Sequence, residues 1–352
     1  MRNKIYDLIL IGGGQSALAC AFFLRRKEID YLVLDDQDKC GASWNQAWES
    51  LTLFSPPEHS SLPGLKMPET QNEFPTRDET INYLCQYEDR YGFPIQRPVH
   101  VKSIEKVDDI FKVMTSNGTY NSRTIISSTG TFRAPFIPDI SGREKFKGEQ
   151  LHSSEYSSPD KFSNQKVVVV GEGNSGAQIL AEVSKFATTQ WSTLQSPEYL
   201  PDDIDGRVLF DVATARYYAQ KKNENFDSSK YNLGNIVMLP PVKEARQRDV
   251  LNSKGEIKAI TEEGVIWQDN SYEEVDTIIW CTGFGYATRF LDDLVSIDNK
   301  GKVPTDSTRA KETDGLWLVG YGGWTGFASA TVIGVGRYAK KTVQEISQYL
   351  KA

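Results

Sequence analysis

Two stretches of the chain share one order of hydrophobic and polar positions. Each opens with a short apolar run, passes through a glycine-rich turn into a helical pattern, and closes much later with another apolar run that ends in Thr-Gly. The first stretch runs from Ile5–Ile11 to Thr129-Gly130, and the second runs from Lys166–Val170 to Thr282-Gly283. Short apolar runs before such turns predict buried strands that lead into helices. The chain therefore contains an internal repeat.

Alternating apolar and polar positions before each Thr-Gly predict a short β-meander. The expected meander strands are Val99–Lys106 and Ile110–Thr115 in the first repeat, and Ile257–Thr261, Val265–Gln268 and Glu273–Cys281 in the second. An Asn117-Gly118 turn and Gly264 punctuate these runs, as hairpins require. Strands alternate with helical patterns elsewhere, which predicts parallel sheets covered by helices and an α/β fold.

The first glycine turn has the form of a dinucleotide site. Gly12-x-Gly14-x-x-Ala17, with Ser16 inside it, opens a helical pattern. Glycines there permit a tight turn, and the helix N-terminus offers unpaired N–H groups to a pyrophosphate. The next strand, Tyr31–Leu34, ends at Asp35, where an acid binds the ribose hydroxyls. Asp36 is the alternative acid, although the spacing favours Asp35. A glycine turn in an α/β protein without a ligand is the alternative for the whole motif.

The second glycine turn predicts a site for a nicotinamide coenzyme. Gly171-x-Gly173-x-x-Gly176 contains Asn174 and Ser175, and the following strand ends near Gln195-Ser196. An acid at that end selects NADH, whereas an arginine holds the 2′-phosphate of NADPH. Neither is present, and a charged hydrogen bond contributes roughly 1.5–3 kcal/mol. We therefore expect both coenzymes to work, within about tenfold in kcat/KM. A second FAD-like turn or a vestigial one is the alternative.

The repeat predicts two Rossmann-like dinucleotide-binding domains, each with a β-meander. Residues 1–156 form the first domain, 157–276 the second, and 277–352 return to the first. Proline-containing stretches at 133–142 and 157–164 are the expected linkers. Residues 198–251, rich in charges and aromatics, are an insertion that we expect to cover the coenzyme cleft and to be a candidate contact of a homodimer.

Composition excludes several classes of protein. The 352 residues are 39% hydrophobic and 25% charged, with a net charge of −7 and no dense Lys/Arg run, so there is no electrostatic footprint for nucleic acid. The first apolar run is too short to span a bilayer and lacks the form of a signal peptide. We expect a cytoplasmic protein that binds neither membrane nor metal. Its scattered cysteines, without a C-x-x-C pair, indicate reduced thiols; they are Cys20, Cys40, Cys85 and Cys281.

Three motifs together resemble those of flavin-containing monooxygenases. Phe146-x-Gly148-x-x-x-His152-x-x-x-Tyr156 resembles the family fingerprint and is close to its Baeyer–Villiger version. Gly41-Ala42-Ser43-Trp44 is similar to the Gly-Gly-x-Trp that follows the FAD acid, and Thr282-Gly283-Phe284 to the late Thr-Gly-aromatic motif. The chain looks most like the short bacterial members. These include oxidisers of sulfides and ketones that accept NADH or NADPH, and monooxygenases of arsenic-resistance operons.

This resemblance implies that the first domain binds FAD and the second binds NADPH or NADH. It also implies O₂ and a small-molecule substrate, with a C4a-(hydro)peroxyflavin as the oxidant for sulfoxidation or Baeyer–Villiger oxidation. The protein then needs no catalytic side chain of its own. The residues implied to contact FAD are Gly12, Gly14, Ser16, Ala17, Asp35, Gly41, Trp44, Thr129 and Gly130. Those implied to contact the coenzyme are Gly171, Gly173, Asn174, Ser175, Gly176, Gln195 and Ser196.

Aromatic side chains are the candidates for the substrate pocket, namely Phe54, Tyr321 and Trp324. In this type of flavoprotein the helix after Gly320–Ala330 points its N-terminus at the flavin. The chain departs from the family at Tyr156-Ser157, where a basic residue is usual, and at Leu51–His59, which lacks an asparagine near the flavin. His152 is interpreted as a hydrogen-bonded structural group; the alternative is a role in coupling coenzyme binding to domain orientation.

Two other functions remain open at this point. One is an NAD(P)H oxidase or flavin reductase that uses the same scaffold and releases peroxide. The other is a non-catalytic flavoprotein that senses nucleotides. Disulfide reductase chemistry is disfavoured, because the sequence holds no C-x-x-C pair.

Overall fold

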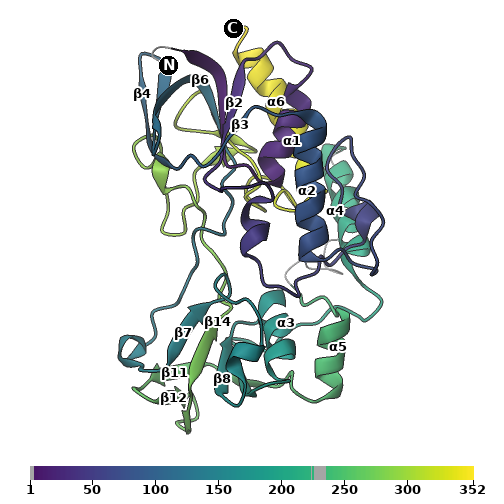
Figure 1. Cartoon of the computed structure of the whole chain (residues 1–352), viewed down its shortest axis with the longest axis vertical. Helices are drawn as coiled ribbons and strands as arrows, with labels where there is room; N and C mark the ends of the chain where they lie inside the picture. The colour runs from purple at the N-terminus through teal and green to yellow at the C-terminus, as the bar shows by residue number, and fades with distance from the viewer. Residues whose placement is uncertain (1–3, 223, 226–234) are drawn as a thin grey trace. The chain divides into compact units, whose positions relative to one another are not determined.

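The computed structural model describes residues 4–222, 224–225 and 235–352, and the chain forms two compact units (Figure 1). Unit 1 comprises Met1–Asn45, Ser55–Ala134 and Gly285–Ala352, and unit 2 comprises Gln46–Phe54 and Pro135–Phe284. The chain thus changes unit at 45–46, 54–55, 134–135 and 284–285, whereas the expected boundaries were 156 and 276. Strand β7 (Glu149–His152) accounts for much of the difference, because it pairs with β14 (Thr277–Trp280) inside unit 2.

The sheet of unit 1 contains the predicted strand β1 (Ile5–Ile11) as an inner strand. This strand lies parallel to β2 (Tyr31–Leu34) on one side and to β6 (Gly118–Ser127) on the other. The last four residues of β1 are buried, as expected of a parallel strand covered on both faces. The outer strands are β3 (Ile95–Gln96), β15 (Thr305–Asp306), β16 (Arg309–Ala310) and β17 (Leu316–Leu318).

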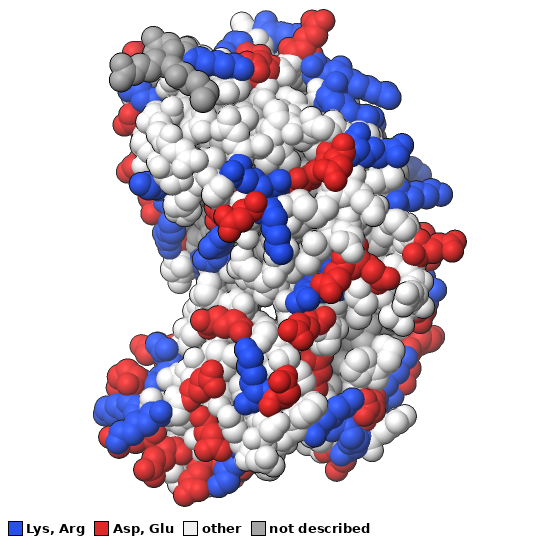
Figure 2. Space-filling model, in the orientation of Figure 1, with Lys and Arg blue, Asp and Glu red and all other residues white. Residues whose placement is uncertain are grey.

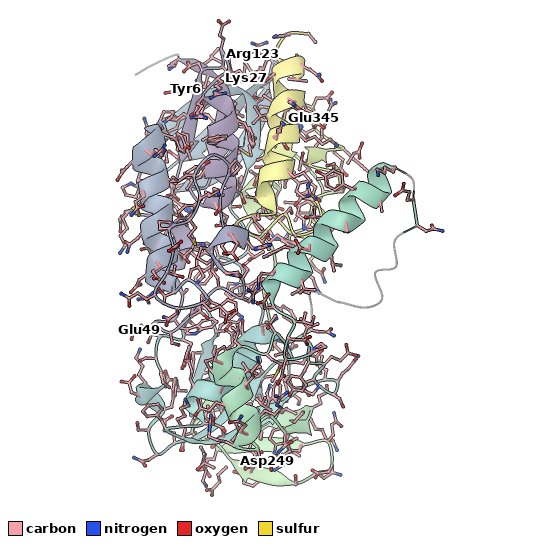
Figure 3. The ribbon with its side chains drawn as sticks, turned by 90° about the vertical axis from the view of Figure 1, so that its right-hand side faces the viewer. Tyr6, Lys27, Glu49, Arg123, Asp249 and Glu345 are labelled. Atoms are coloured by element: carbon pink, nitrogen blue, oxygen red, sulfur yellow. A yellow bond between two sulfur atoms is a disulfide. The ribbon has the colours of Figure 1, made fainter. Side chains whose placement is uncertain are left out.

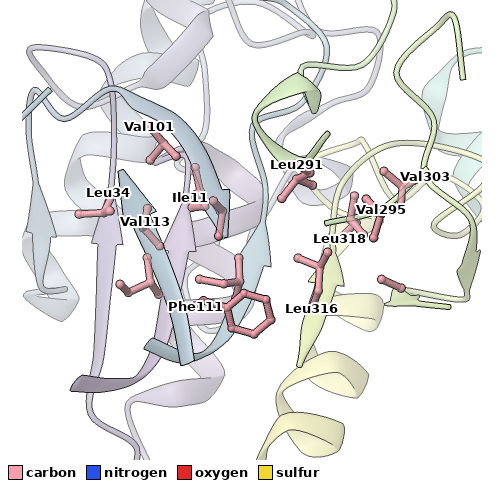
Figure 4. Packing of buried hydrophobic residues seen from close by; sticks show 14 of the residues in the cluster. Ile11, Leu34, Val101, Phe111, Val113, Leu291, Val295, Val303, Leu316 and Leu318 are labelled. Carbon is pink, nitrogen blue, oxygen red and sulfur yellow. The ribbon is translucent and has the colours of Figure 1, made fainter. Parts of the chain in front are cut away.

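The predicted first meander is present as β4 (Val101–Val107), β5 (Ile110–Thr115) and β6. Alternate residues of β5, such as Phe111 and Val113, face inward and are fully buried. They pack with residues of β1, β4 and β17 in one hydrophobic cluster (Figure 4). The period-two pattern therefore places one face of the meander against the core of unit 1.

The described residues of unit 1 form three α-helices: α1 (Gln15–Leu24), α2 (Arg77–Tyr91) and α6 (Val335–Tyr349). Helix α1 contacts both of the others (Figure 1). The sequence analysis did not anticipate α2, although Thr76 and Glu79 form a capping box and Gly92 ends the helix in the left-handed region. On α6, Glu345 (labelled in Figure 3) accepts a hydrogen bond from Trp317 Nε1 at 3.0 Å, which ties the helix to β17.

Unit 2 contains a parallel sheet in the order β10-β9-β8-β14-β7, with β8 (Lys166–Val170), β9 (Thr188–Ser192) and β10 (Ser253–Gly255). Its meander is β11 (Ile257–Ile260), β12 (Gly264–Trp267) and β13 (Tyr272–Glu274). The single strand expected over 273–281 is divided. Its first part pairs antiparallel with β12 as β13, and its second part joins the parallel sheet as β14.

Helices of unit 2 cover the parallel sheet and fill the insertion. Helix α3 (Asn174–Val183) follows β8 and packs against α5 (Pro240–Gln247). Helix α4 (Gly206–Lys221) lies in the predicted insertion, of which residues 223 and 226–234 are outside the described part. Short 3₁₀ helices complete the two units: η1 (Ala42–Gln46), η2 (Pro57–His59), η3 (Arg143–Lys145), η4 (Asp160–Phe162) and η5 (Arg289–Leu291). The expected α/β fold is confirmed.

The prediction that all four thiols are reduced is wrong. Cys40 and Cys85 form a disulfide, with their Cα atoms 5.3 Å apart. They are separated by 45 positions, so no short spacing motif in the sequence predicts the pair. The packing of α2 beside the loop after β2 brings them together. Cys20 and Cys281 are free and buried.

The surface carries charges of both signs. On the face drawn in Figure 2, Lys and Arg side chains are interspersed with Asp and Glu. None of the described helices combines the length and apolar character needed to cross a bilayer.

Candidate functional site

The predicted glycine turn of unit 1 joins β1 to α1. Gly12 has a φ of +97°, and a Cβ there would lie 2.7 Å from the carbonyl oxygen of Ser128, so this position requires glycine. Gly14 is the N-cap of α1, with φ −80°, and a Cβ there would meet only Ala42, at 3.5 Å. The first turn of α1 contains no acidic residue. An anion at this end of α1 would therefore meet unpaired N–H groups and no carboxylate of the first turn.

The acid predicted after β2 lies beside this turn. A Cβ on Gly13 would lie 2.3 Å from Asp35 Oδ2, which places the carboxylate against the glycine loop. The buried carboxylates of Asp35 and Glu88 share one half-buried cation, Arg97. Arg97 Nε donates to Oδ2 of Asp35 at 2.7 Å, and its two terminal nitrogens donate to the two oxygens of Glu88, both at 2.7 Å. The alternative acid, Asp36, forms an ion pair with Arg133 at 3.0 Å.

In the triad of Asp35, Glu88 and Arg97, burial and the positive charge shift the pKa of the carboxyls in opposite directions. Burial raises the pKa of Asp35 and of Glu88, and the hydrogen bonds and positive charge of Arg97 lower it. Arg97 satisfies both carboxylates at once through the planar fork of its guanidinium. The sequence analysis missed Arg97, since no spacing rule connects it to an acid 62 positions earlier.

The other residues expected around the first nucleotide gather at the same end of the sheet. Trp44 Nε1 donates to Gln15 Oε1 at 3.4 Å, at the start of α1. The side chain of Ser16 packs on Gly320, where a Cβ would lie 1.9 Å from its Oγ. Thr129 is hydrogen-bonded to the Tyr321 hydroxyl, 2.7 Å from its own Oγ1. The structure thus brings them together, with Ala17, Gly41 and Gly130 on the same segments.

The three candidate pocket residues have different surroundings. Tyr321 is 1% exposed and lies in the core of unit 1, so it does not line an open pocket; its hydroxyl bonds Ser127 and Thr129 instead. Trp324 packs partly buried on that core, and its buried Nε1 has no hydrogen-bond partner among the described residues. Phe54 belongs to unit 2, where its ring stacks on Phe210 at a centroid distance of 5.8 Å.

The second glycine turn joins β8 to α3 in unit 2. Gly171 has a φ of +130°, and a Cβ there would lie 2.2 Å from the carbonyl oxygen of Cys281. A Cβ on Gly176 would lie 2.2 Å from the carbonyl oxygen of Gly171, so this glycine lets α3 approach the turn closely. Gly173, the N-cap of α3, has no atom within 4 Å of an added Cβ. The start of α3, which includes Ser175, is therefore open in the same way as the start of α1.

Two side chains near this turn have roles that the sequence did not reveal. Asn174 Oδ1 accepts the N–H of Val237 at 2.8 Å, so this residue, expected at the coenzyme, anchors the insertion. Glu172 lies between the first two glycines of the motif. Its carboxylate accepts the backbone N–H groups of Leu194 and Gln195, both at 3.0 Å. The only signal in the sequence was a charged residue inside the glycine motif.

The fingerprint residues pack inside unit 2 as structural groups. Phe146 is in the hydrophobic core, and a Cβ on Gly148 would lie 2.4 Å from the carbonyl oxygen of Asp276. The Tyr156 hydroxyl donates to the half-buried carboxylate of Glu182, on α3, at 3.0 Å. His152 Nε2 is 2.9 Å from the Gly283 carbonyl oxygen, and its Nδ1 accepts the N–H of Ser154 at 3.1 Å. The contacts of Gly148 and His152 hold β7 beside the ends of β14, and that of Tyr156 holds the following segment against α3.

His152 gives unit 2 a dependence on pH. Burial lowers its pKa below the ordinary value of 6.5, more than the Gly283 carbonyl raises it. The unfolded chain therefore takes up a proton first as the pH falls, and stability is lost below about pH 6.5. We expect His152→Gln to lose less unfolding free energy than the wild type between about pH 7.5 and about pH 5.5 in urea titrations. His100→Gln, at an exposed histidine, is the control; an equal loss in all three proteins would contradict this role.

Comparison with known proteins agrees with this arrangement. Residues 9–193 match the model of the pyridine nucleotide-disulphide oxidoreductase family. A flavin-containing monooxygenase from Stenotrophomonas maltophilia is 40% identical, with a TM-score of 0.90 and 99% of each chain covered. An uncharacterized CzcO-like oxidoreductase of Geobacillus kaustophilus is 30% identical over 98% of this chain and 99% of that relative. The indole-3-pyruvate monooxygenase YUCCA1 of Oryza sativa subsp. japonica is 26% identical over 89% of this chain and 86% of its own length.

The flavin-containing monooxygenase of Stenotrophomonas maltophilia and the CzcO-like relative match nearly the whole chain. The chain is therefore an oxidoreductase, which removes the non-catalytic alternative. Its family depends on FAD and NAD(P). The chain belongs to the pyridine nucleotide-disulphide oxidoreductase family and, within it, to the bacterial flavin-containing monooxygenases.

Proposed function

We propose that this enzyme uses NADH or NADPH and O₂ to insert one oxygen atom into a small soft nucleophile or a ketone. The observation that carries the proposal is the pair of open helix N-termini, one in each unit, each preceded by a buried strand and a glycine turn. Two such sites in one monooxygenase fold suit two dinucleotides, one that stays bound and one that is consumed.

FAD fits the site of unit 1. The space in front of Gly14 admits a pyrophosphate to the N–H groups of α1, and Asp35 or Asp36 would hold the ribose. The buried indole N–H of Trp324 lacks an acceptor among the described residues, and a bound group would supply one. When bound there, FAD would supply the redox chemistry that links the nicotinamide coenzyme to O₂. The chain would position the cofactor through these groups.

The coenzyme fits the site of unit 2. Gly173 leaves space for its pyrophosphate at α3, and Gly176 lets the helix approach closely. Gln195 and Ser196 lie exposed after β9, where they would meet the adenosine ribose. His152 and Tyr156 have their polar atoms engaged inside unit 2, so they support the fold of the site and supply no acid or base.

Aromatic groups support an apolar substrate. The ring of Trp324, partly buried on the core of unit 1, offers a surface that suits neutral sulfides and ketones. The alternative is an oxidase that uses the same electrons to make peroxide. It is favoured by the segment Leu51–His59, which lacks the asparagine usual in the family.

Isotope labelling separates the two functions. The holoenzyme is supplied with NADH and ¹⁸O₂ and, in separate reactions, a thioether, a cyclic ketone, an amine and a trivalent arsenical. We expect one ¹⁸O atom in the sulfoxide or the lactone, together with some peroxide. Stoichiometric peroxide and no labelled product from any of the four would show an oxidase and overturn the monooxygenase proposal.

A further inference from the structure

The carboxylate of Glu172 spans the two loops that flank the predicted adenosine ribose. Its backbone belongs to the glycine turn after β8, and its side chain reaches the turn after β9. There Oε2 accepts the N–H groups of Leu194 and Gln195, both at 3.0 Å. In a dinucleotide-binding unit, the end of this second strand is where NADH and NADPH differ, because the ribose 2′ position meets the protein there.

Of the Lys and Arg side chains that the structure describes, none forms an ion pair with the carboxylate of Glu172. In the described part of the chain, residues 193–196 make no hydrogen bond to a Lys or Arg side chain, and Gln195 and Ser196 are exposed and uncharged. Lys254, on the adjacent strand β10, is paired with Glu273 at 2.8 Å. The second oxygen of Glu172, Oε1, has no partner among the described residues and remains available as an acceptor.

The two coenzymes would meet this carboxylate differently. A ribose 2′-hydroxyl can donate a hydrogen bond to it, as to the acid of an NADH-selective site. A 2′-phosphate would bring like charge to an ionised carboxylate. It would also find the backbone N–H groups of the turn, which suit an anion, already occupied by Glu172. The geometry therefore favours the coenzyme without the phosphate.

We infer that Glu172 determines coenzyme specificity by discriminating against the 2′-phosphate, so that the enzyme prefers NADH to NADPH. The inference rests on the proposed binding of the coenzyme in unit 2. It revises the expectation that NADH and NADPH are used almost equally. That expectation considered only Gln195 and Ser196 at the end of the second strand. The acid that selects NADH comes from the other loop.

Glu172→Gln is the informative substitution. Glutamine keeps an oxygen that accepts the N–H groups of Leu194 and Gln195, and it removes the charge. Glu263→Gln is the matched control, because Glu263 is an exposed glutamate of the same unit, in the turn between β11 and β12. Both variants change the net charge equally, and only one changes the charge at the ribose.

Steady-state kinetics of the holoenzymes give the first test. At low ionic strength we expect the wild type to favour NADH by more than about tenfold in kcat/KM. Glu172→Gln should raise kcat/KM for NADPH by about 10- to 100-fold and change that for NADH by less than about threefold, whereas Glu263→Gln should change neither. Added salt should reduce the difference between the kcat/KM values of the wild type for NADH and NADPH, since it screens exposed charges.

Calorimetric titration with NAD⁺ and NADP⁺ gives a readout that is independent of turnover. The inference predicts tighter NADP⁺ binding by Glu172→Gln, with NAD⁺ binding little changed. A NADPH-to-NADH ratio that moves by less than about threefold in this variant would overturn it, as would equal weakening of both coenzymes, which marks a purely structural role. Failure of the wild type to bind either coenzyme would instead remove the proposed site of unit 2, and this inference with it.

Discussion

Gly14→Ala is expected to produce a folded protein that does not retain FAD. The φ of Gly14 is −80°, which alanine adopts without strain. The new methyl group would make only an ordinary contact, at 3.5 Å from Ala42. It would, however, fill the space through which a pyrophosphate reaches the N–H groups of α1. We therefore expect loss of nearly all NADH oxidation, with a cost in unfolding free energy of no more than about 1 kcal/mol for alanine at an N-cap.

Flavin absorbance after gel filtration, combined with thermal unfolding, checks this result. Gly12→Ala provides the contrast, because a Cβ there would lie 2.7 Å from a backbone oxygen and the φ is +97°; it should destabilise unit 1 itself. Gly173→Ala is the counterpart in unit 2 and should keep FAD while its KM for the coenzyme rises. A Gly14→Ala protein that keeps a full complement of FAD would place the flavin elsewhere.

The predictable parts of the fold are those that depend on residues close together in the sequence. The strand β1 and the glycine turns follow from apolar runs that end in glycine. Gly12 and Gly171 both adopt positive φ values, as tight turns between a strand and a helix require. The internal repeat then predicted a second nucleotide-binding unit from the sequence alone. Such glycine turns can be predicted because the backbone conformation at these positions requires glycine whatever the tertiary contacts are.

The features that were missed depend on contacts between distant segments. Arg97 reaches Asp35 across 62 positions, and Cys40 meets Cys85 across 45. Glu172 could be seen in the motif, but its effect depends on the turn after β9, 22 positions away. The pattern of residues 273–281 predicts one strand, yet its first part pairs in the meander sheet and its second part in the parallel sheet. Side-chain pattern does not specify partners, so these features emerged only with the structure.

Replacing Arg97 by methionine is expected to destabilise unit 1 by about 3–5 kcal/mol at neutral pH, because it leaves two buried carboxylates without a counter-ion. The side chains of Asp35 and Glu88 are only 3% and 10% exposed, and Arg97 donates to both at 2.7 Å. Methionine matches much of the volume of the arginine stem, so lost packing contributes little. Urea unfolding of the wild type and the variant at neutral pH measures the difference.

The dependence on pH identifies the cause. Burial already raises the pKa of Asp35 and Glu88 against the opposing effect of Arg97, and removal of the guanidinium would raise both further. Carboxyls with a raised pKa bind protons more readily in the folded state, so the variant loses stability as the pH rises above their unfolded values. Its deficit relative to the wild type should therefore shrink as the solution is acidified.

Neutralising the carboxylates provides the decisive control for this triad. Adding Asp35→Asn and Glu88→Gln to Arg97→Met removes every charge, and we expect it to restore much of the lost stability, since an uncharged cluster of similar volume escapes the cost of unpaired ions. Arg97→Lys should fall between the wild type and Arg97→Met, because one ammonium group cannot bond both carboxylates in the same planar arrangement. A loss below about 1 kcal/mol in Arg97→Met, or a deficit that is constant with pH, would show that the triad adds little to the stability of unit 1.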